Sequence, residues 1–407
     1  MKDKYVDRLV SPDAHSITRH LPKFLSPIFS FVVLHKILYL KLGETYNEFL
    51  FKTGKSLGKS IAEKLKDFGA HKQKSELIRF FLKEFENLGF GHCKIKLLNV
   101  EASTCVISNL TNPISKQHKR TFGIQKEAVD FFIAGLYSGG LSKILNKDCF
   151  FIEKECISRN ENSCVFHLSF DCQFKHEKIS QEEIDKIINW ENLHSEYGSK
   201  YPNTLIQKII QLKQIQLYLG ELKVWNIYCV FFPIDIYLVT YEFFKMHNVD
   251  LSNELCYLGI VQAKIAILFQ VNKFGIKNGI ATFNSIVNQL EFFGFGKGKL
   301  IESNEQKLVV HFKNSYAIFQ YRAMFRKVES FDDVYVKGIL IGAACYAFGK
   351  NLGSIGQDIK NNDIVYTFLY TTDKKNSVIE NYLSGIRNKK ITAIIEERMK
   401  HKYYLLT

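Results

Sequence analysis

A glutamate and two cysteines lie close together in the sequence and are the side chains best suited to chemistry. Glu153 and Cys156 come at the end of one predicted strand, and Cys164 begins the predicted return strand. The polar turn between the strands brings both thiols to one end of a hairpin. Thiolates and carboxylates are ligands that zinc accepts in tetrahedral sites. The sequence therefore predicts a metal site with a fourth ligand still to be found, and two small buried cysteines are the alternative interpretation.

Small residues that recur at a nearly constant distance indicate an internal repeat. One set recurs about 205 residues later and another about 203 residues later: Gly54 and Gly58 as Gly259 and Ala263, and Gly135 and Gly139 as Gly338 and Gly342. The pattern is typical of two tandem copies of one domain. Because Gly54 and Gly58 share one helix face, they predict either close helix packing or the wall of a ligand site.

Apolar spacing and turn residues predict the elements that must position these side chains. In the first copy we expect helices at 27–42, 44–66, 75–88 and 125–145, strands at 94–100, 104–109, 149–156 and 164–170, and a loop at Pro113. In the second copy we expect helices at 233–246, 251–273, 279–292 and 332–350 and strands at 299–303, 307–312 and 364–370. The fold class is α+β, with two copies of a helical layer on a small antiparallel sheet forming an internal pseudo-dimer.

The expected domain organisation follows from the repeat. It comprises an N-terminal extension at 1–24, a first domain at 25–172, a helical connector at 173–222, a second, degenerate domain at 223–371 and a basic C-terminal tail at 372–407.

Four segments of the first copy resemble the 4-vinyl-reductase, or hydrocarbon-binding, domain. They are Leu42–Lys59, Ala134–Gly139, Glu153–Cys156 and Cys164–Phe166. This domain occurs in the sensor modules of phenol-responsive transcription activators and in a bacteriochlorophyll biosynthesis protein, and it is similar in fold to the TRAPP vesicle-tethering subunits. The resemblance implies a domain that holds a small hydrophobic molecule.

The resemblance also implies a structural zinc site and its ligands. The matching positions are Asp130, Glu153, Cys156 and Cys164. Asp130 departs from the pattern because the family has a cysteine there, and Cys149 or Cys105 is the alternative fourth ligand. The second copy has no cysteine between Gly356 and Tyr370, so zinc is expected in the first domain only.

A hydrophobic small molecule or acyl chain is the ligand that the resemblance implies for the first domain. The expected ligand-binding residues are Gly54, Gly58, Phe80, Phe81, Phe131, Phe132 and Tyr137. Aromatic residues at helical spacing are also typical of an ordinary core, which is the alternative interpretation.

Composition limits the classes of protein that the chain can represent. The chain has 407 residues, a net charge of +14 and nine cysteines, and we expect a cytoplasmic location because its first residues do not form a secretory signal. The apolar run Val224–Phe244 contains several polar residues, so no transmembrane segment is expected. The lysines are scattered, which favours a solvated surface over a nucleic-acid footprint.

The sequence favours a binding protein over an enzyme. It shows no nucleotide-binding or hydrolase motif, and no catalytic residue is predicted. We expect a zinc-stabilised, sensor-type domain that acts through a protein partner, as a monomer or a homodimer. One alternative is an accessory factor or reductase in tetrapyrrole or lipid metabolism. The other is a ligand-free scaffold or a nucleic-acid-associated protein that uses its basic surface.

Overall fold

The computed structural model describes most of the chain. The described residues are 24–68, 73–102, 104–172, 174, 177–188, 215–224, 227–232, 234–275, 279–292, 295–325, 331–373, 377–385 and 393. They fall into two compact units, one containing Ser26–Pro233 and the other containing Ile234–His401. The predicted basic tail and the middle of the predicted connector lie largely outside the described residues.

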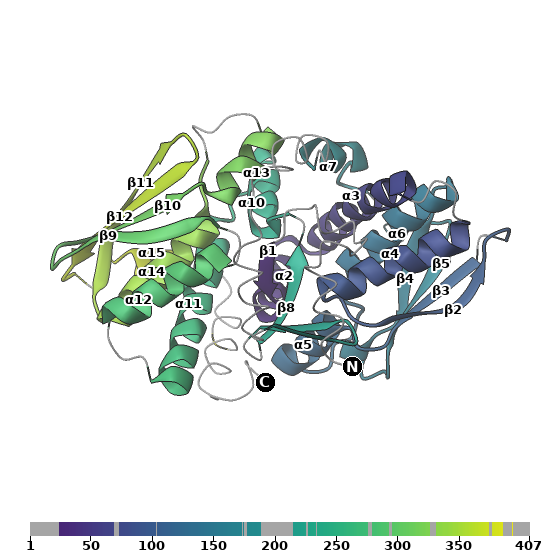
Figure 1. Ribbon diagram of the computed structural model, residues 1–407, viewed down its shortest axis with the longest axis horizontal. Helices are drawn as coiled ribbons and strands as arrows, with labels where there is room; N and C mark the ends of the chain where they lie inside the picture. The colour runs from purple at the N-terminus through teal and green to yellow at the C-terminus, as the bar shows by residue number, and fades with distance from the viewer. Residues whose placement is uncertain are drawn as a thin grey trace. The chain divides into compact units, whose positions relative to one another are not determined.

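The first unit packs helices against an antiparallel sheet (Figure 1). Its helices are α2 (Ile28–Leu42), α3 (Glu44–Phe68), α4 (Lys74–Leu88), α5 (Pro113–Phe122), α6 (Phe131–Leu145) and α7 (Gln181–Ile187). Its main sheet has the order β2-β3-β5-β4 and consists of β2 (Cys93–Asn99), β3 (Thr104–Asn109), β4 (Phe150–Glu155) and β5 (Cys164–Ser169). Because α4 contacts β2 and α6 contacts β4, these two helices cover one face of the sheet.

The second unit has the same order of elements. Its helices are α10 (Ile236–Met246), α11 (Ser252–Phe274), α12 (Gly279–Phe292), α13 (Tyr316–Phe325), α14 (Val334–Phe348) and α15 (Val378–Gly385). Its strands are β9 (Lys297–Ser303), β10 (Lys307–Lys313), β11 (Asn351–Lys360) and β12 (Asp363–Thr371), in the order β11-β12-β10-β9. The expected α+β class with small antiparallel sheets is therefore confirmed.

Glycine allows the two central helices of each unit to touch through their backbones. A Cβ atom on Gly58 would overlap the carbonyl oxygen of Leu136, and one on Gly139 would overlap that of Lys55, so α3 and α6 leave no room for a side chain between them. In the second unit a Cβ atom on Gly338 of α14 would overlap the carbonyl oxygen of Cys256 on α11. The repeated glycines are thus sites of close helix packing.

Two segments of the first unit differ from the sequence-based expectation. The loop expected at Pro113 is helix α5, with proline in its first turn and Asn112 as its N-cap. The helix expected from 125 begins only at Phe131, after Asp130 at the N-cap position. The short capped helix was missed because its apolar residues do not form a continuous stripe.

Two further elements were missed in the second unit, and the connector differs from the expected helix. Helix α13 and most of β11 were not predicted. Within the expected connector, the structure shows the short helix α7 and the strand β6 (Ile215–Tyr218). β6 pairs with β7 (Glu221–Val224), which pairs with β8 (Ile227–Phe232). β1 (Phe24–Pro27) is the remaining neighbour of β8.

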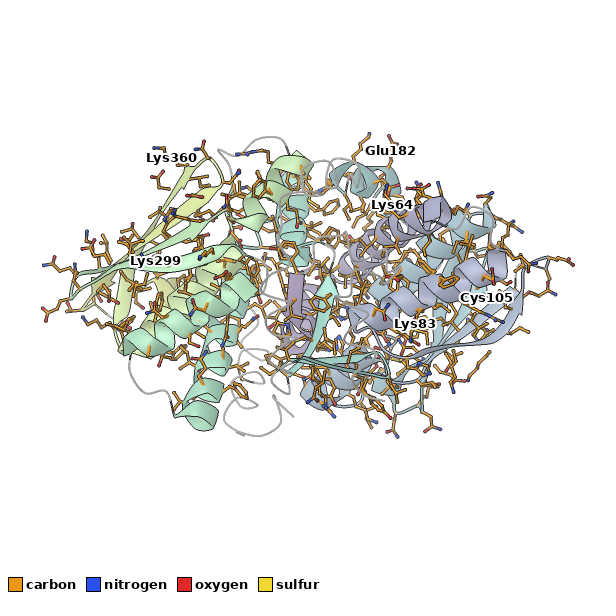
Figure 2. The ribbon with its side chains drawn as sticks, viewed as in Figure 1. Lys64, Lys83, Cys105, Glu182, Lys299 and Lys360 are labelled. Atoms are coloured by element: carbon orange, nitrogen blue, oxygen red, sulfur yellow. The ribbon has the colours of Figure 1, made fainter. Side chains whose placement is uncertain are left out.

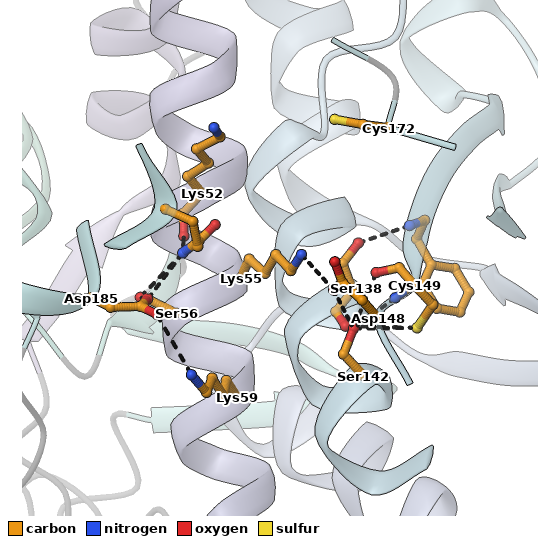
Figure 3. Close-up of polar contacts among 12 residues, drawn as sticks. Lys52, Lys55, Ser56, Lys59, Ser138, Ser142, Asp148, Cys149, Cys172 and Asp185 are labelled. Atoms are coloured by element: carbon orange, nitrogen blue, oxygen red, sulfur yellow. Dashed lines mark hydrogen bonds and ion pairs between the residues drawn. The ribbon is translucent and has the colours of Figure 1, made fainter. Parts of the chain in front are cut away.

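Polar contacts hold the segment around α7 against α3. Buried Lys52 lies 2.8 Å from Glu177 and 3.1 Å from Glu48. One turn further along α3, Ser56 donates to Asp185, whose other oxygen lies 3.6 Å from Lys59 (Figure 3). The outer side of α3 is therefore covered by the first part of the connector.

Lysine side chains and one long apolar helix are the features of the folded chain that bear on its possible partners. Figure 2 labels Lys64 on α3 and Lys83 on α4 of the first unit, and Lys299 on β9 and Lys360 on β11 of the second. By length and composition, one helix among the described residues could cross a membrane: Ser252–Asn272, within α11. Since 67% of that segment is buried, a core helix accounts for it equally well.

We expect Gly58→Ala to lower the free energy of unfolding by about 1–3 kcal/mol, because the added methyl group forces the α3 and α6 backbones apart. Chemical denaturation measures the change. Lys64→Ala on the same helix is the control, because the Lys64 side chain is partly exposed and forms only a surface ion pair with Asp67, so its loss should change stability little. Equal stability of Gly58→Ala and the native chain would contradict the close packing of these helices.

Candidate metal centre

Four buried side chains from three parts of the first unit meet at one point. Asp130 precedes α6, Glu153 lies on β4, Cys156 follows β4, and Cys164 begins β5. One ligand atom from each lies within 4.8 Å of the others, so this group could hold a metal ion. Antiparallel pairing of β4 with β5 brings the two cysteines together, as the hairpin pattern predicted. The structure therefore brings together all four residues that the resemblance implied.

The distances fit a tetrahedral ion. The Sγ atoms of Cys156 and Cys164 lie 4.0 Å apart, and one ligand atom from each of the four side chains lies within 4.8 Å of the others. With metal–sulfur bonds of about 2.3 Å and metal–oxygen bonds of about 2.1 Å, tetrahedral geometry gives about 3.8 Å between sulfurs and about 3.6 Å between sulfur and oxygen. The two sulfurs already have nearly this spacing, and shifts of about 1 Å in the carboxylates would complete the coordination.

Each carboxylate in the group is anchored through one oxygen. Glu153 Oε2 accepts hydrogen bonds from the backbone N–H groups of Val129 and Asp130, both at 3.2 Å. Asp130 Oδ2 accepts hydrogen bonds from Asn112 and Ser115. The other oxygens, Glu153 Oε1 and Asp130 Oδ1, are buried and have no partner among the described residues. Unpartnered buried oxygens are costly, and a bound cation would satisfy them.

Hydrogen bonds also reach both sulfurs. The backbone N–H of Ile157 donates to Cys164 Sγ at 3.4 Å, and Ser158 Oγ lies 2.9 Å from Cys156 Sγ. Both donors come from the short 3₁₀ turn Ile157–Arg159 that follows β4. Such donors stabilise thiolates and orient them as metal ligands.

Burial and mutual repulsion shift the titration of the group. Burial, followed by the charge of Cys156, raises the pKa of Asp130 to about 7. Burial and the charge of Asp130 raise the pKa of Glu153 well above its ordinary value. A hydrogen bond from Cys164 lowers the pKa of Cys156 to about 5. The two carboxyl groups therefore hold protons that a bound cation would displace, whereas Cys156 loses its proton more readily than an ordinary thiol.

Two residues near the centre could not be predicted from the sequence. Asn112 and Ser115 are fully buried and lie on the first turn of α5, the helix that was expected to be a loop. An Asn-Pro-x-Ser pattern predicts an N-cap, which is the signal that could have revealed α5. Its proximity to Asp130 depends on tertiary packing.

The alternative ligands lie outside the group. Cys149 Sγ is 3.4 Å from Ser142 Oγ, at the other end of β4 from Glu153 (Figure 3). Cys105 lies on β3, and burial raises its pKa to about 12, with the neighbouring Cys149 adding to the shift. The structure thus favours Asp130 as the fourth member.

In the second unit, Asp333 is also buried but caps its helix. Its side chain accepts a hydrogen bond from the N–H of Val336 in the first turn of α14. Asp130, by contrast, makes no side-chain cap at α6. The two aspartates at the same place in the element order therefore have different partners.

The expected ligand-binding residues have different surroundings. The α6 backbone packs against Gly54 and Gly58, which favours close helix packing, the other interpretation of these glycines. Phe80 is 46% exposed, and Phe131 lies half-buried with its ring 6.1 Å from that of Phe174. Phe80 is directed to solvent because it lies on the outer side of the amphipathic helix α4.

The remaining predicted aromatics belong to the interior of the first unit. Phe81 stacks edge-on against Phe85, and Phe132 lies 5.9 Å from Phe90. Tyr137 is fully buried, and its hydroxyl lies 3.0 Å from Cys93 Sγ. Its ring contacts three phenylalanine rings edge-on, those of Phe85, Phe151 and Phe166. Tyr137 thus provides a single hydroxyl group inside an aromatic cluster.

Two buried histidines form a pair between α2 and α5. His35 lies on α2, and His118 lies about one turn beyond Ser115 on α5. His35 Nδ1 lies 3.0 Å from His118 Nε2, and His35 Nε2 lies 2.9 Å from Asn47 Oδ1. Since Asn47 Oδ1 can only accept, the arrangement assigns the His35 proton to Nε2 and makes His118 the donor to His35. Burial lowers the pKa of His35 to about 4 and also lowers that of His118. Both rings are therefore neutral at pH 7.

Comparisons with known proteins give no matching family or curated relative, but they do give similar solved structures. No protein-family model and no curated protein matches the chain. Among the solved structures that match is the phenol-responsive sensory domain of the transcription activator PoxR with phenol, at 17% identity and a TM-score of 0.31. The match covers 43% of this chain and 82% of that domain.

We expect the buried His35–His118 pair to lower the free energy of unfolding as the pH decreases from 6.5 toward 4. In this range the unfolded chain protonates its histidines, whereas His35 and His118 stay neutral, so protons favour unfolding. His35 should contribute a loss on the order of 2 kcal/mol between pH 7 and 5. Urea denaturation across this range should show that the unfolding free energy of the native chain decreases relative to that of His35→Asn as the pH decreases, because only the native chain carries the His35 contribution. Exposed His167→Gln is the control, and equal slopes in all three proteins would contradict the buried neutral pair.

Proposed function

We propose that the first unit is a zinc-stabilised, sensor-type module that binds a small hydrophobic molecule. The buried Asp130, Glu153, Cys156 and Cys164 group is the observation that carries the proposal. Its two thiolates favour zinc over magnesium or calcium, which prefer oxygen ligands alone. The distances, the two unpartnered oxygens and the hydrogen bonds to both sulfurs support the same conclusion.

The role of zinc here is structural. All four side chains are buried and belong to the protein, whereas a catalytic zinc keeps one position open for water or substrate. The ion would join the start of α6 to the end of β4 and the start of β5. Since these elements enclose Tyr137 and its aromatic neighbours, zinc would fix one wall of the interior.

The ligand component of the proposal rests on the aromatic cluster and on the family resemblance of the sequence. A hydrophobic molecule or an acyl chain suits an interior of aromatic rings, and the Tyr137 hydroxyl could exchange its contact with Cys93 Sγ for a hydrogen bond to the ligand. The second unit would be a degenerate copy that arose by duplication. It has the same order of helices and strands as the first unit, and Asp333 caps a helix where the first unit has the proposed zinc group. We propose that signalling or assembly then requires a partner protein.

We expect the purified protein to contain about one zinc ion per chain and Cys156→Ser to lose it. Because the binding free energy of a structural site is folding free energy, Cys156→Ser should also unfold at a lower temperature. Elemental analysis and calorimetry measure the two effects. Cys149→Ser, which replaces a buried thiol outside the group, should keep its zinc. Absence of zinc from the native protein would refute the zinc component.

We expect a phenolic probe to bind the native protein more tightly than the same aromatic molecule without its hydroxyl group. Because the preference depends on one neutral hydrogen bond, the two affinities should differ by about 2–10-fold. Tyr137→Phe should remove this difference. Isothermal titration of both probes against both proteins measures it. Failure of either probe to bind the native chain would instead support the ligand-free scaffold.

A further inference from the structure

The first turn of α5 forms hydrogen bonds with one of the four grouped side chains. Asn112 Oδ1 accepts a hydrogen bond from Ser115 N and so caps the helix, while Asn112 Nδ2 donates to Asp130 Oδ2 at 2.7 Å. Ser115 Oγ also donates to Asp130 Oδ2. Both side chains are completely buried. A single carboxylate oxygen thus accepts two hydrogen bonds from one helix turn.

These two donors direct Asp130 away from the usual role of an aspartate in front of a helix. An aspartate at this position commonly accepts a hydrogen bond from the helix backbone, as Asp333 does from Val336. Asp130 makes no such bond. Its Oδ2 is held by α5, and its Oδ1 is left buried and unpartnered.

We propose that Asn112 and Ser115 are positioning residues that make Asp130 a metal ligand through a single oxygen. The inference rests on the proposed zinc site. A carboxylate can rotate and can bind through either oxygen or through both. Hydrogen bonds to one oxygen fix the plane of the carboxylate and leave one donor atom for the ion. They also offset part of the negative charge that two carboxylates and two thiolates bring to a buried site.

The contribution of Ser115 to zinc binding should depend on which residue stands at position 130. A cysteine at this position would supply one sulfur atom, with no second ligand atom for α5 to hold. Ser115 should therefore matter when residue 130 is aspartate and matter little when it is cysteine. A general packing role for Ser115, which also lies 3.2 Å and 3.3 Å from the sulfurs of Cys156 and Cys164, would not depend on residue 130 in this way.

A double-mutant cycle on the full chain tests the inference. Zinc affinity is measured by competition with a chromophoric chelator for Ser115→Ala in the native and Asp130→Cys backgrounds. We expect a loss of about 10–100-fold in the native background and a several-fold smaller loss in the cysteine background, where only the contacts of Ser115 with the two sulfurs remain. Ser158→Ala is the matched control, because Ser158 contacts Cys156 and should weaken binding equally in both backgrounds. Equal losses for Ser115→Ala in both backgrounds would overturn the inference.

Asn112 provides a second test, in which helix capping and ligand positioning are separated. Asn112→Ser keeps a side-chain oxygen for the cap but replaces the longer side chain whose amide N–H group reaches Asp130, whereas Asn112→Ala removes both groups. We expect Asn112→Ser to recover the stability lost in Asn112→Ala without recovering zinc affinity. The absorption spectrum of the cobalt(II)-loaded protein reports the ligand set independently of stability. Full recovery of affinity in Asn112→Ser would overturn the inference, whereas a native chain that binds no zinc would refute the zinc site itself.

Discussion

The backbone contact between α3 and α6 is the constraint on which the first unit depends. Gly58 and Gly139 lie where a side chain would overlap the other helix, so the two axes can approach closely only with glycine at these positions. This contact fixes α6, and its first residues then lie beside the β4–β5 hairpin. Glu153 binds the backbone N–H groups at that helix start, which ties the strand to the helix end.

The metal group is the second consequence of this arrangement. Two carboxyl groups and two thiols that are buried together repel one another when they ionise, and burial disfavours each charged form. This penalty is the reason that the pKa values of Asp130 and Glu153 are raised. A divalent cation removes it, because the ion replaces the retained protons and pairs with all four groups at once.

The two units show how one order of elements accommodates two kinds of interior. Both pair a long helix with a shorter one through glycine, and both have sheets with the same strand order. The first unit joins its last hairpin to the helix start through ionisable side chains. In the second unit Asp333 caps the helix, and the hairpin contributes apolar rings such as Tyr366, which packs against Phe312. The framework therefore tolerates different chemistry at the same place.

The sequence by itself determined the features with short repeats or distinctive residues: the α+β class, most helices and strands, and Glu153, Cys156 and Cys164 at one hairpin. Local periodicity is enough for these. Only the tertiary structure showed that Gly54 and Gly58 face the α6 backbone and that Asn112 and Ser115 hold Asp130. Such contacts join residues far apart in the chain. Because they depend on how the helices pack against one another, a local sequence pattern does not predict them.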